Sequence, residues 1–84
     1  MAWIKNWFSN MEKFDKPLVY KGISYCTVEN FYQAMKIKDV HERKKISLMN
    51  PYAAKKYVRT LVIRDDWHDI KLKVMEFAIR YFNR

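Results

Sequence analysis

The chain has 84 residues, of which 50% are hydrophobic and 17% are aromatic, and its formal net charge is +8. This length predicts one domain with a small core, and the apolar content excludes an intrinsically disordered chain. The excess of Lys and Arg favours a polyanionic or phosphate-bearing partner, and a merely soluble basic surface explains it about equally well.

The first predicted elements form a β-hairpin. Residues 18–20 and 23–26 are short β-favouring runs on either side of Lys21-Gly22, which is a turn sequence. Within the second run, we expect Cys26 to be a small buried hydrophobic residue rather than a nucleophile. A hairpin of this size is only marginally stable alone, so it must pack on helices.

The next element is predicted to be a helix over about residues 28–37. Thr27 carries the hydroxyl that an N-cap needs. One set of residues follows helical spacing and predicts the buried face: Val28, Phe31, Tyr32 and Met35. Glu29, Gln33 and Lys36 follow the same spacing on a different, polar face.

Three further helices are predicted. A helix at about residues 40–48 carries the basic cluster Arg43-Lys44-Lys45. Asn50-Pro51 is typical of an N-cap followed by proline at the first helical position, and it predicts a helix at about 51–58. The last helix should begin near Asp65-Asp66, which can cap it, and continue to about residue 82. The predicted fold class is therefore α+β, predominantly helical, with a small N-terminal β-hairpin packed on about four helices.

The single cysteine excludes an internal disulfide and indicates a reducing, cytoplasmic setting. The two histidines, His41 and His68, are far apart in sequence and give no metal-ligand spacing, so we predict no metal site. No apolar run approaches the length of a membrane span, and we predict no membrane association.

Glu29 has two interpretations. It can be an ordinary carboxylate of a first helical turn, where it interacts well with the helix dipole. It can also face a pocket, where a carboxylate could stabilise an oxocarbenium-like sugar centre or activate a water. Gln33 could then orient a substrate and Lys36 could contact a phosphate. The spacing alone favours the structural interpretation.

Two other segments, FSN at residues 8–10 and RDDW at 64–67, leave the same choice open. Arg64 suits bidentate recognition of phosphate, but it can also be a solvated charge. Trp67 offers a ring for stacking, but it is also in phase with the apolar positions of the last helix. Ser9 and Asn10 are turn residues by default and could equally bind ribose hydroxyls.

In their order and spacing, these segments resemble the NADAR family (NAD and ADP-ribose associated, also called YbiA-like). The family pattern is FSNF, a hairpin with one Gly, T-x-E-x-x-x-Q-A-x-K, a basic helix, a P-x-x-A-K helix, and R-x-x-W opening a helix with an internal V-M. This chain matches it with FSNM at 8–11, Lys21-Gly22, Thr27 to Lys36, Pro51 to Lys55, Arg64 to Trp67 and Val74-Met75. No single motif is specific, but the ordered set covers roughly residues 7–82.

The resemblance implies a YbiA-like fold and an N-glycosidase. Family members are associated with cleaving N-glycosidic bonds in phosphorylated riboflavin-pathway intermediates or in ADP-ribose attached to guanine bases. Glu29 matches the catalytic position and Trp67 the active-site Trp. The other positions expected to bind substrate are Phe8, Ser9, Asn10, Gln33, Lys36 and Arg64. The expected ligand is ADP-ribose or a phosphorylated nucleotide-like molecule, with no cofactor, because a stabilised oxocarbenium ion and one water suffice.

The chain also departs from the family pattern. Members usually continue with an acidic segment followed by W-G that contributes to the site, so we expect this chain to be a C-terminally short member. Asn30 stands where His is frequent, and the Gly common near the P-x-x-A-K helix is replaced around Tyr57-Val58. The missing part puts turnover in doubt more than the substitutions do, because an open site holds substrate weakly and admits water.

Several functions therefore stay open. The first is an N-glycosidase-like protein that binds or cleaves an ADP-ribose- or nucleotide-type substrate. The alternative is a catalytically inactive basic relative that binds a nucleotide, a nucleic acid or a host protein, for example a phage-encoded accessory protein or inhibitor. A third is a nucleic-acid-binding domain that uses Arg43-Lys44-Lys45, Lys55-Lys56 and Arg59, and a fourth is a fragment of a longer enzyme. The apolar and aromatic content also predicts a homodimer.

Overall fold

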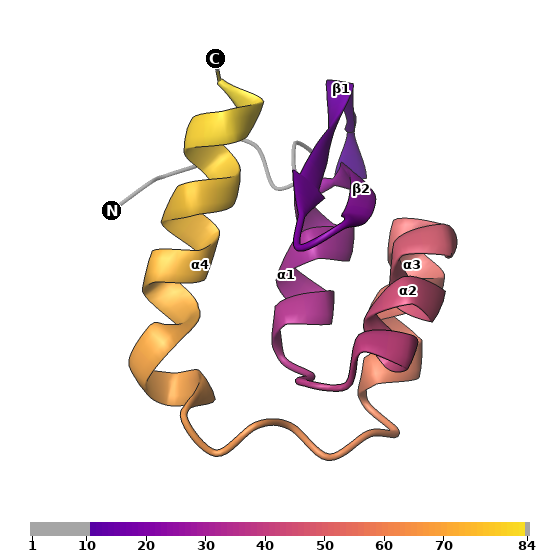
Figure 1. Cartoon of the computed structure of the whole chain (residues 1–84), viewed down its shortest axis with the longest axis vertical. Helices are drawn as coiled ribbons and strands as arrows, with labels where there is room; N and C mark the ends of the chain where they lie inside the picture. Colours follow the sequence, from indigo (N-terminus) through magenta and orange to yellow (C-terminus); the bar gives the residue numbers. More distant parts are fainter. Residues whose placement is uncertain (1–10, 84) are drawn as a thin grey trace.

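The computed structural model describes residues 11–83, which form a two-stranded antiparallel hairpin followed by four helices (Figure 1). The elements are β1 (Lys13–Tyr20), β2 (Ile23–Thr27), α1 (Val28–Met35), α2 (Val40–Leu48), α3 (Pro51–Val58) and α4 (Trp67–Phe82). The predicted α+β class is confirmed, and α2 and α3 have the predicted bounds. The first helix ends two residues earlier than predicted, and the hairpin is longer because β1 already begins at residue 13.

The hairpin turns at Lys21 and Gly22, which have φ angles of 50° and 81°. Two positive φ angles in succession match the right-handed twist of a two-residue hairpin turn, and glycine adopts such angles without steric cost. In the part of β2 that pairs with β1 next to the turn, the side chains of Ile23 and Tyr25 point into the core. Because side chains alternate along a strand, Cys26 lies on the opposite face and is exposed, so its predicted burial is wrong.

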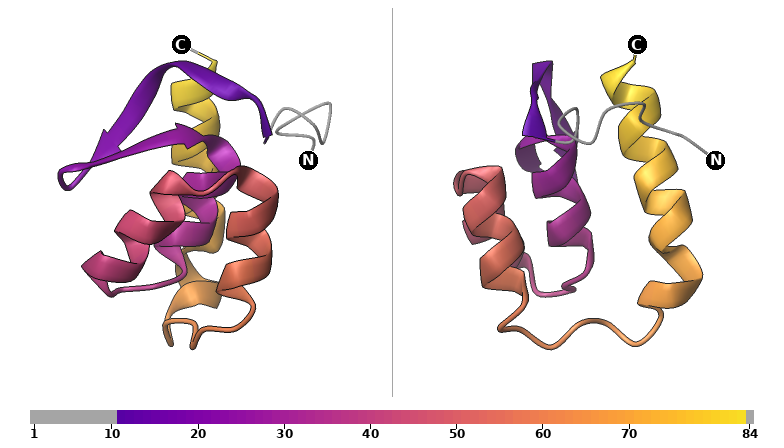
Figure 2. Two further views of the ribbon diagram at one scale, coloured as in Figure 1. Left: turned by 90° about the vertical axis from the view of Figure 1, so that its right-hand side faces the viewer. Right: turned by 180° about the vertical axis from the view of Figure 1, so that it is seen from behind.

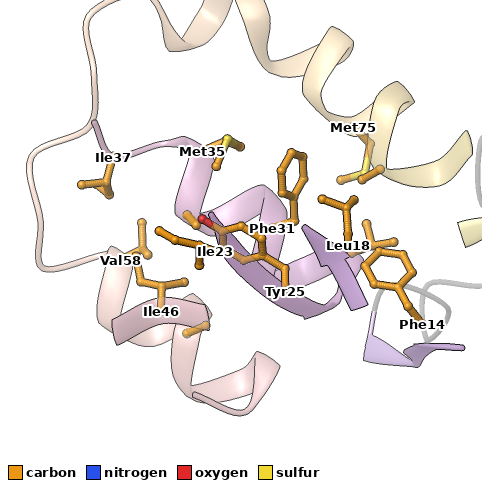
Figure 3. Packing of buried hydrophobic residues seen from close by; sticks show 14 of the residues in the cluster. Phe14, Leu18, Ile23, Tyr25, Phe31, Met35, Ile37, Ile46, Val58 and Met75 are labelled. Atoms are coloured by element: carbon orange, nitrogen blue, oxygen red, sulfur yellow. The ribbon is translucent and has the colours of Figure 1, made fainter. Parts of the chain in front are cut away.

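Helix α1 lies at the centre of the molecule, with α4 on one side and the α2–α3 pair on the other (Figures 1 and 2). Its Phe31 is 2% exposed, and the ring lies 5.4 Å from that of Tyr25 and 5.7 Å from that of Phe77, measured between centroids. Figure 3 shows this ring within the buried hydrophobic cluster, between residues of the hairpin and residues of the helices. The central position of α1 means that its polar side chains are also surrounded by other elements.

The predicted caps of α1 and α3 are confirmed. The Thr27 hydroxyl accepts the Asn30 N–H at 3.0 Å, and the Asn50 side chain accepts the Ala53 N–H at 2.8 Å. The predicted cap of α4 is wrong: Asp66 occupies the N-cap position, but its side chain makes no capping bond. The physical reason is a charge-assisted hydrogen bond from Arg64, which is stronger than a bond to a neutral backbone N–H.

Asn30, the residue that departs from the family pattern, has a structural role. It is buried, and its amide donates to the carbonyl oxygens of Ile46 and Met49, both at 2.8 Å. These carbonyls lie at the C-terminal end of α2, where the Ile46 oxygen also accepts the N–H of the cap residue Met49 at 3.3 Å. Asn30 therefore fastens α1 to the end of α2.

The core also contains one unsatisfied polar group, which gives a testable prediction. Tyr25 is fully buried, and its hydroxyl has no hydrogen-bond partner among residues 11–83. We expect Tyr25→Phe to raise the free energy of unfolding by about 1–2 kcal/mol, because it removes a desolvated hydroxyl and keeps the ring. Urea unfolding followed by circular dichroism at pH 7 measures this change, and a destabilised variant would contradict the account.

The same variant should change the response to alkali. Burial raises the pKa of Tyr25 above 10.0, so the folded state keeps its phenolic proton at a pH where the unfolded chain loses it. The unfolded state then binds fewer protons than the folded state, and stability falls as the pH rises through 10. Tyr25→Phe should reduce the part of this loss that Tyr25 causes.

Candidate functional site

The polar face of α1 is buried at its N-terminal end. Glu29 is 5% exposed and Gln33 is 3% exposed. The Gln33 Nε2 atom donates to Glu29 Oε2 at 2.5 Å, so the two side chains are held together one turn apart. Glu29 is thus not the solvated first-turn carboxylate that helix formation alone would explain, since burying a carboxylate costs free energy unless it has partners.

A cation and two aromatic rings lie next to this pair. The Lys36 ammonium lies 5.4 Å from the ring centroid of Tyr32 and 5.9 Å from that of Trp67. The two rings contact each other edge to face, with centroids 5.1 Å apart. Such distances allow cation–π attraction. The start of α4 and the end of α1 therefore bring together Trp67 and Lys36, which are 31 positions apart in sequence.

Trp67 packs in the core, which is one of the two positions left open for it, whereas Tyr32 is less buried than predicted. Trp67 is 6% exposed and belongs to the hydrophobic core, so it packs as the first apolar residue of α4 as well as touching Lys36. Tyr32 was expected on the buried face of α1, but it is only partly buried and contacts both Trp67 and Lys36. Its position four residues before Lys36 is the sequence signal that could have placed it in the site.

Arg64 lies beside the same end of α1, but its side chain already has partners. Its Nε and Nη2 atoms donate to the two carboxylate oxygens of Asp66 at 2.6 and 3.2 Å, and Nη1 donates to the Met35 carbonyl at 3.4 Å. Its backbone N–H donates to the Lys36 carbonyl at 2.9 Å. The hydrogen bond from Arg64 lowers the pKa of Asp66. Arg64 thus joins the loop before α4 to the end of α1, and its contact with a phosphate stays a prediction.

Three predicted site residues cannot be placed. Phe8, Ser9 and Asn10 lie outside the described residues. The geometry of the candidate site therefore comes from α1, α3, α4 and the loop between α3 and α4.

A small cavity of about 160 Å³ adjoins the polar face of α1. It is lined by Gln33, Lys36, Lys55, Val58, Arg59 and Ile63. Burial lowers the pKa of Lys36, the positive charges of Lys55, Arg59 and Lys71 lower it further, and the Glu29 carboxylate opposes them. Sequence reasoning placed Lys55 and Arg59 on a basic surface and missed this cavity, because nothing in their spacing shows that α3 packs against α1.

The basic cluster of α2 is only partly available to a polyanion. Arg43 is buried, and its Nε donates to the Ile37 carbonyl at 2.6 Å, whereas Lys44 and Lys45 are exposed. Arg43 therefore binds the loop between α1 and α2 through its hydrogen bond to Ile37. It does not belong to a solvent-facing binding surface. This corrects the nucleic-acid interpretation, which used all three residues.

Two larger cavities, of about 430 and 450 Å³, lie between β1 and α4. Their lining residues are Phe14, Asp15, Lys16 and Phe82 in one, Leu18, Val19, Phe77 and Arg80 in the other, and Tyr81 in both. None of the predicted site residues within residues 11–83 is among these lining residues. The homodimer stays a prediction.

Within residues 11–83, no group of three or more His, Cys, Asp or Glu side chains is arranged to hold a metal ion. No helix in this part of the chain is long and apolar enough to cross a membrane. The described residues of the candidate site bring together a carboxylate, an amide, aromatic rings and cations.

Comparison with known proteins supports the predicted resemblance. No family model and no curated protein gives a significant match to the sequence. Among solved structures, the NMR structure of the E. coli protein YbiA matches with a TM-score of 0.67 and 26% sequence identity. The match covers 93% of this chain and 49% of the YbiA chain, so the chain spans about half the length of that relative. The YbiA-like fold inferred from the motifs is confirmed.

Proposed function

We propose that this YbiA-like chain binds an ADP-ribose- or nucleotide-type ligand and that Glu29 promotes hydrolysis of its N-glycosidic bond. The observation that carries the proposal is the buried Glu29 carboxylate, fixed by Gln33 beside Lys36 and its two aromatic rings. The motif resemblance and the likeness to YbiA support it.

The proposed reaction needs only water and the residues of α1. The bond between the sugar C1 and the base nitrogen breaks, its electron pair leaves with the base, and an oxocarbenium-like C1 develops. The Glu29 carboxylate stabilises this positive charge and accepts a proton from the attacking water, and the base finally takes up that proton. Gln33 occupies Oε2 of Glu29, while Oε1 makes no hydrogen bond within residues 11–83 and is the oxygen that would act.

The rings and the cation account for binding in this proposal. Tyr32 is partly exposed, so its ring can contact a base or a ribose. Trp67 supports Tyr32 and Lys36 from the core and meets the ligand with a small part of its ring. The Lys36 ammonium attracts a phosphate group.

A specific observation favours the alternative, which is binding without turnover. Gln33 and Lys36 line the cavity, but Glu29 and Trp67 are not among its lining residues. A ligand could therefore occupy the cavity without reaching the carboxylate. In this case the chain is a basic relative that binds a nucleotide, a nucleic acid or a protein.

One assay separates the two functions. The full chain is incubated with DNA carrying ADP-ribosylated guanine and with a phosphorylated aminopyrimidine riboside, and free base is measured by mass spectrometry. Release of base supports the enzyme. Absence of release, together with ADP-ribose binding that weakens in Trp67→Phe but not in the exposed neighbour variant His68→Ala, supports the binding protein. Absence of both release and binding would contradict the proposal.

A further inference from the structure

Three cations and no acidic residue are among the described residues that line the cavity between α1 and α3. The cations are Lys36, the C-cap of α1, and Lys55 and Arg59 from α3 and its C-cap. Lys55 and Arg59 are four residues apart in α3 and its cap, so they lie on the same side of the helix one turn apart. Figure 2 shows α1 and α3 side by side, as their contacts require.

The partners of Arg59 and Arg64 differ in a way that decides which of them can bind an anion. Arg64 donates to both carboxylate oxygens of Asp66, so its charge is compensated. Within residues 11–83, no hydrogen bond or ion pair joins the Arg59 side chain to a carboxylate. A guanidinium with uncompensated charge presents its parallel N–H groups to phosphate oxygens.

The size of the cavity restricts the ligand group that fits. Pockets that hold a whole drug-sized ligand typically have volumes of about 300–1,000 Å³. At about 160 Å³ this cavity is too small for a base with its ribose, but it suits a compact group. Val58 and Ile63 supply the apolar part of the cavity wall.

We propose that Lys36, Lys55 and Arg59 form an anion site that takes a phosphate or pyrophosphate group, with Gln33 as a further hydrogen-bond donor or acceptor. The identity of the rest of the ligand rests on the proposed function. The anion site itself does not, because an inorganic anion has no N-glycosidic bond.

The state of Lys36 fits this role. Its pKa is lowered by burial, and three further cations face it: Lys55 and Arg59 from α3 and Lys71 from α4. The charge of the Glu29 carboxylate acts in the opposite direction. A bound anion would relieve the repulsion among these cations. Binding should therefore weaken as the pH rises toward the Lys36 pKa, which lies below 10.5, since the ammonium then loses its charge.

The test is a titration of the full chain with inorganic pyrophosphate, in which the heat of binding is measured by isothermal titration calorimetry at fixed ionic strength. We expect Arg59→Gln to weaken binding about tenfold or more, because a charge-assisted hydrogen bond is lost. The matched control is Arg80→Gln, which removes the same charge from an exposed position on α4 and should change the affinity less than about twofold. Equal weakening by both variants, or no pyrophosphate binding, would overturn the proposal.

Two further arms identify the source of the phosphate. ADP-ribose that binds with the same dependence on Arg59 supports a small phosphorylated ligand. A single-stranded oligonucleotide that binds with that dependence supports a nucleic-acid backbone as the source. Oligonucleotide binding that both Arg variants weaken equally, with a steep salt dependence, indicates general surface charge and would contradict the site. Inorganic pyrophosphate binding is measured without any N-glycosidic bond, so failure of hydrolysis with retained pyrophosphate binding differs from failure of the anion site, in which pyrophosphate does not bind.

Discussion

Glu29→Gln is expected to lower the rate of base release by about 10²–10⁴-fold, which is the usual contribution of a general acid or base. The substitution keeps the size of the side chain and an oxygen that can accept the Gln33 amide, but it removes the negative charge. It therefore removes the group that would stabilise the oxocarbenium-like centre and accept a proton, and it leaves the packing of α1 in place. The rate is measured as base released per chain under single-turnover conditions.

The control for this prediction is Glu76→Gln, which makes the same chemical change on the exposed surface of α4. It should leave the rate and the unfolding curve unchanged within about 0.5 kcal/mol. Base release that continues at the wild-type rate in Glu29→Gln would contradict the role given to this carboxylate. A circular-dichroism melt of the variant verifies that any loss of rate does not come from unfolding.

Phe31→Ala is expected to lower the free energy of unfolding by about 3–5 kcal/mol, the usual cost of truncating a buried Phe. Phe31 belongs to α1, and its ring contacts Tyr20 of β1, Tyr25 of β2 and Phe77 of α4. A domain of this length has a free energy of unfolding of roughly 4–13 kcal/mol. The expected loss is therefore a large part of that free energy, or all of it. Urea unfolding at 10 °C measures it, with Phe31→Leu as a milder variant that still folds.

The control is Val19→Ala, since Val19 is 64% exposed at the hairpin surface. Its expected effect is about 0.5 kcal/mol or less. A loss below about 1 kcal/mol in Phe31→Ala would show that α1 is not the helix on which the hairpin and α4 both pack.

Local signals explain why much of the fold could be predicted. The start of α3 follows from Asn50-Pro51, and the turn of the hairpin follows from Lys21-Gly22. The exposed position of Cys26 could also have been found, because Ile23 and Tyr25 are the more apolar alternate positions of β2 and side chains alternate along a strand. Overlooking that alternation is what made the expectation for Cys26 wrong.

The sequence predicted the part of the candidate site that lies on α1, but not the part that comes from α3 or the pairing within the loop before α4. Helical periodicity grouped Glu29, Gln33 and Lys36, and the structure joins the first two by a hydrogen bond. Periodicity cannot show that Arg59 faces the same cavity, because that depends on how α3 packs on α1. Nor could it show that Asp66 pairs with Arg64 instead of capping α4, because two partners compete for one carboxylate.

An NMR titration with ADP-ribose tests the central claim most directly, which is that one ligand site joins the polar face of α1 to the cations of α3. The account predicts that the largest chemical-shift changes occur at the side-chain amide of Gln33, the indole N–H of Trp67, the backbone amide of Lys36 and the guanidinium of Arg59. Changes centred on the cavities between β1 and α4, at Phe14, Phe77 and Tyr81, would contradict it, as would the absence of any change at millimolar ligand.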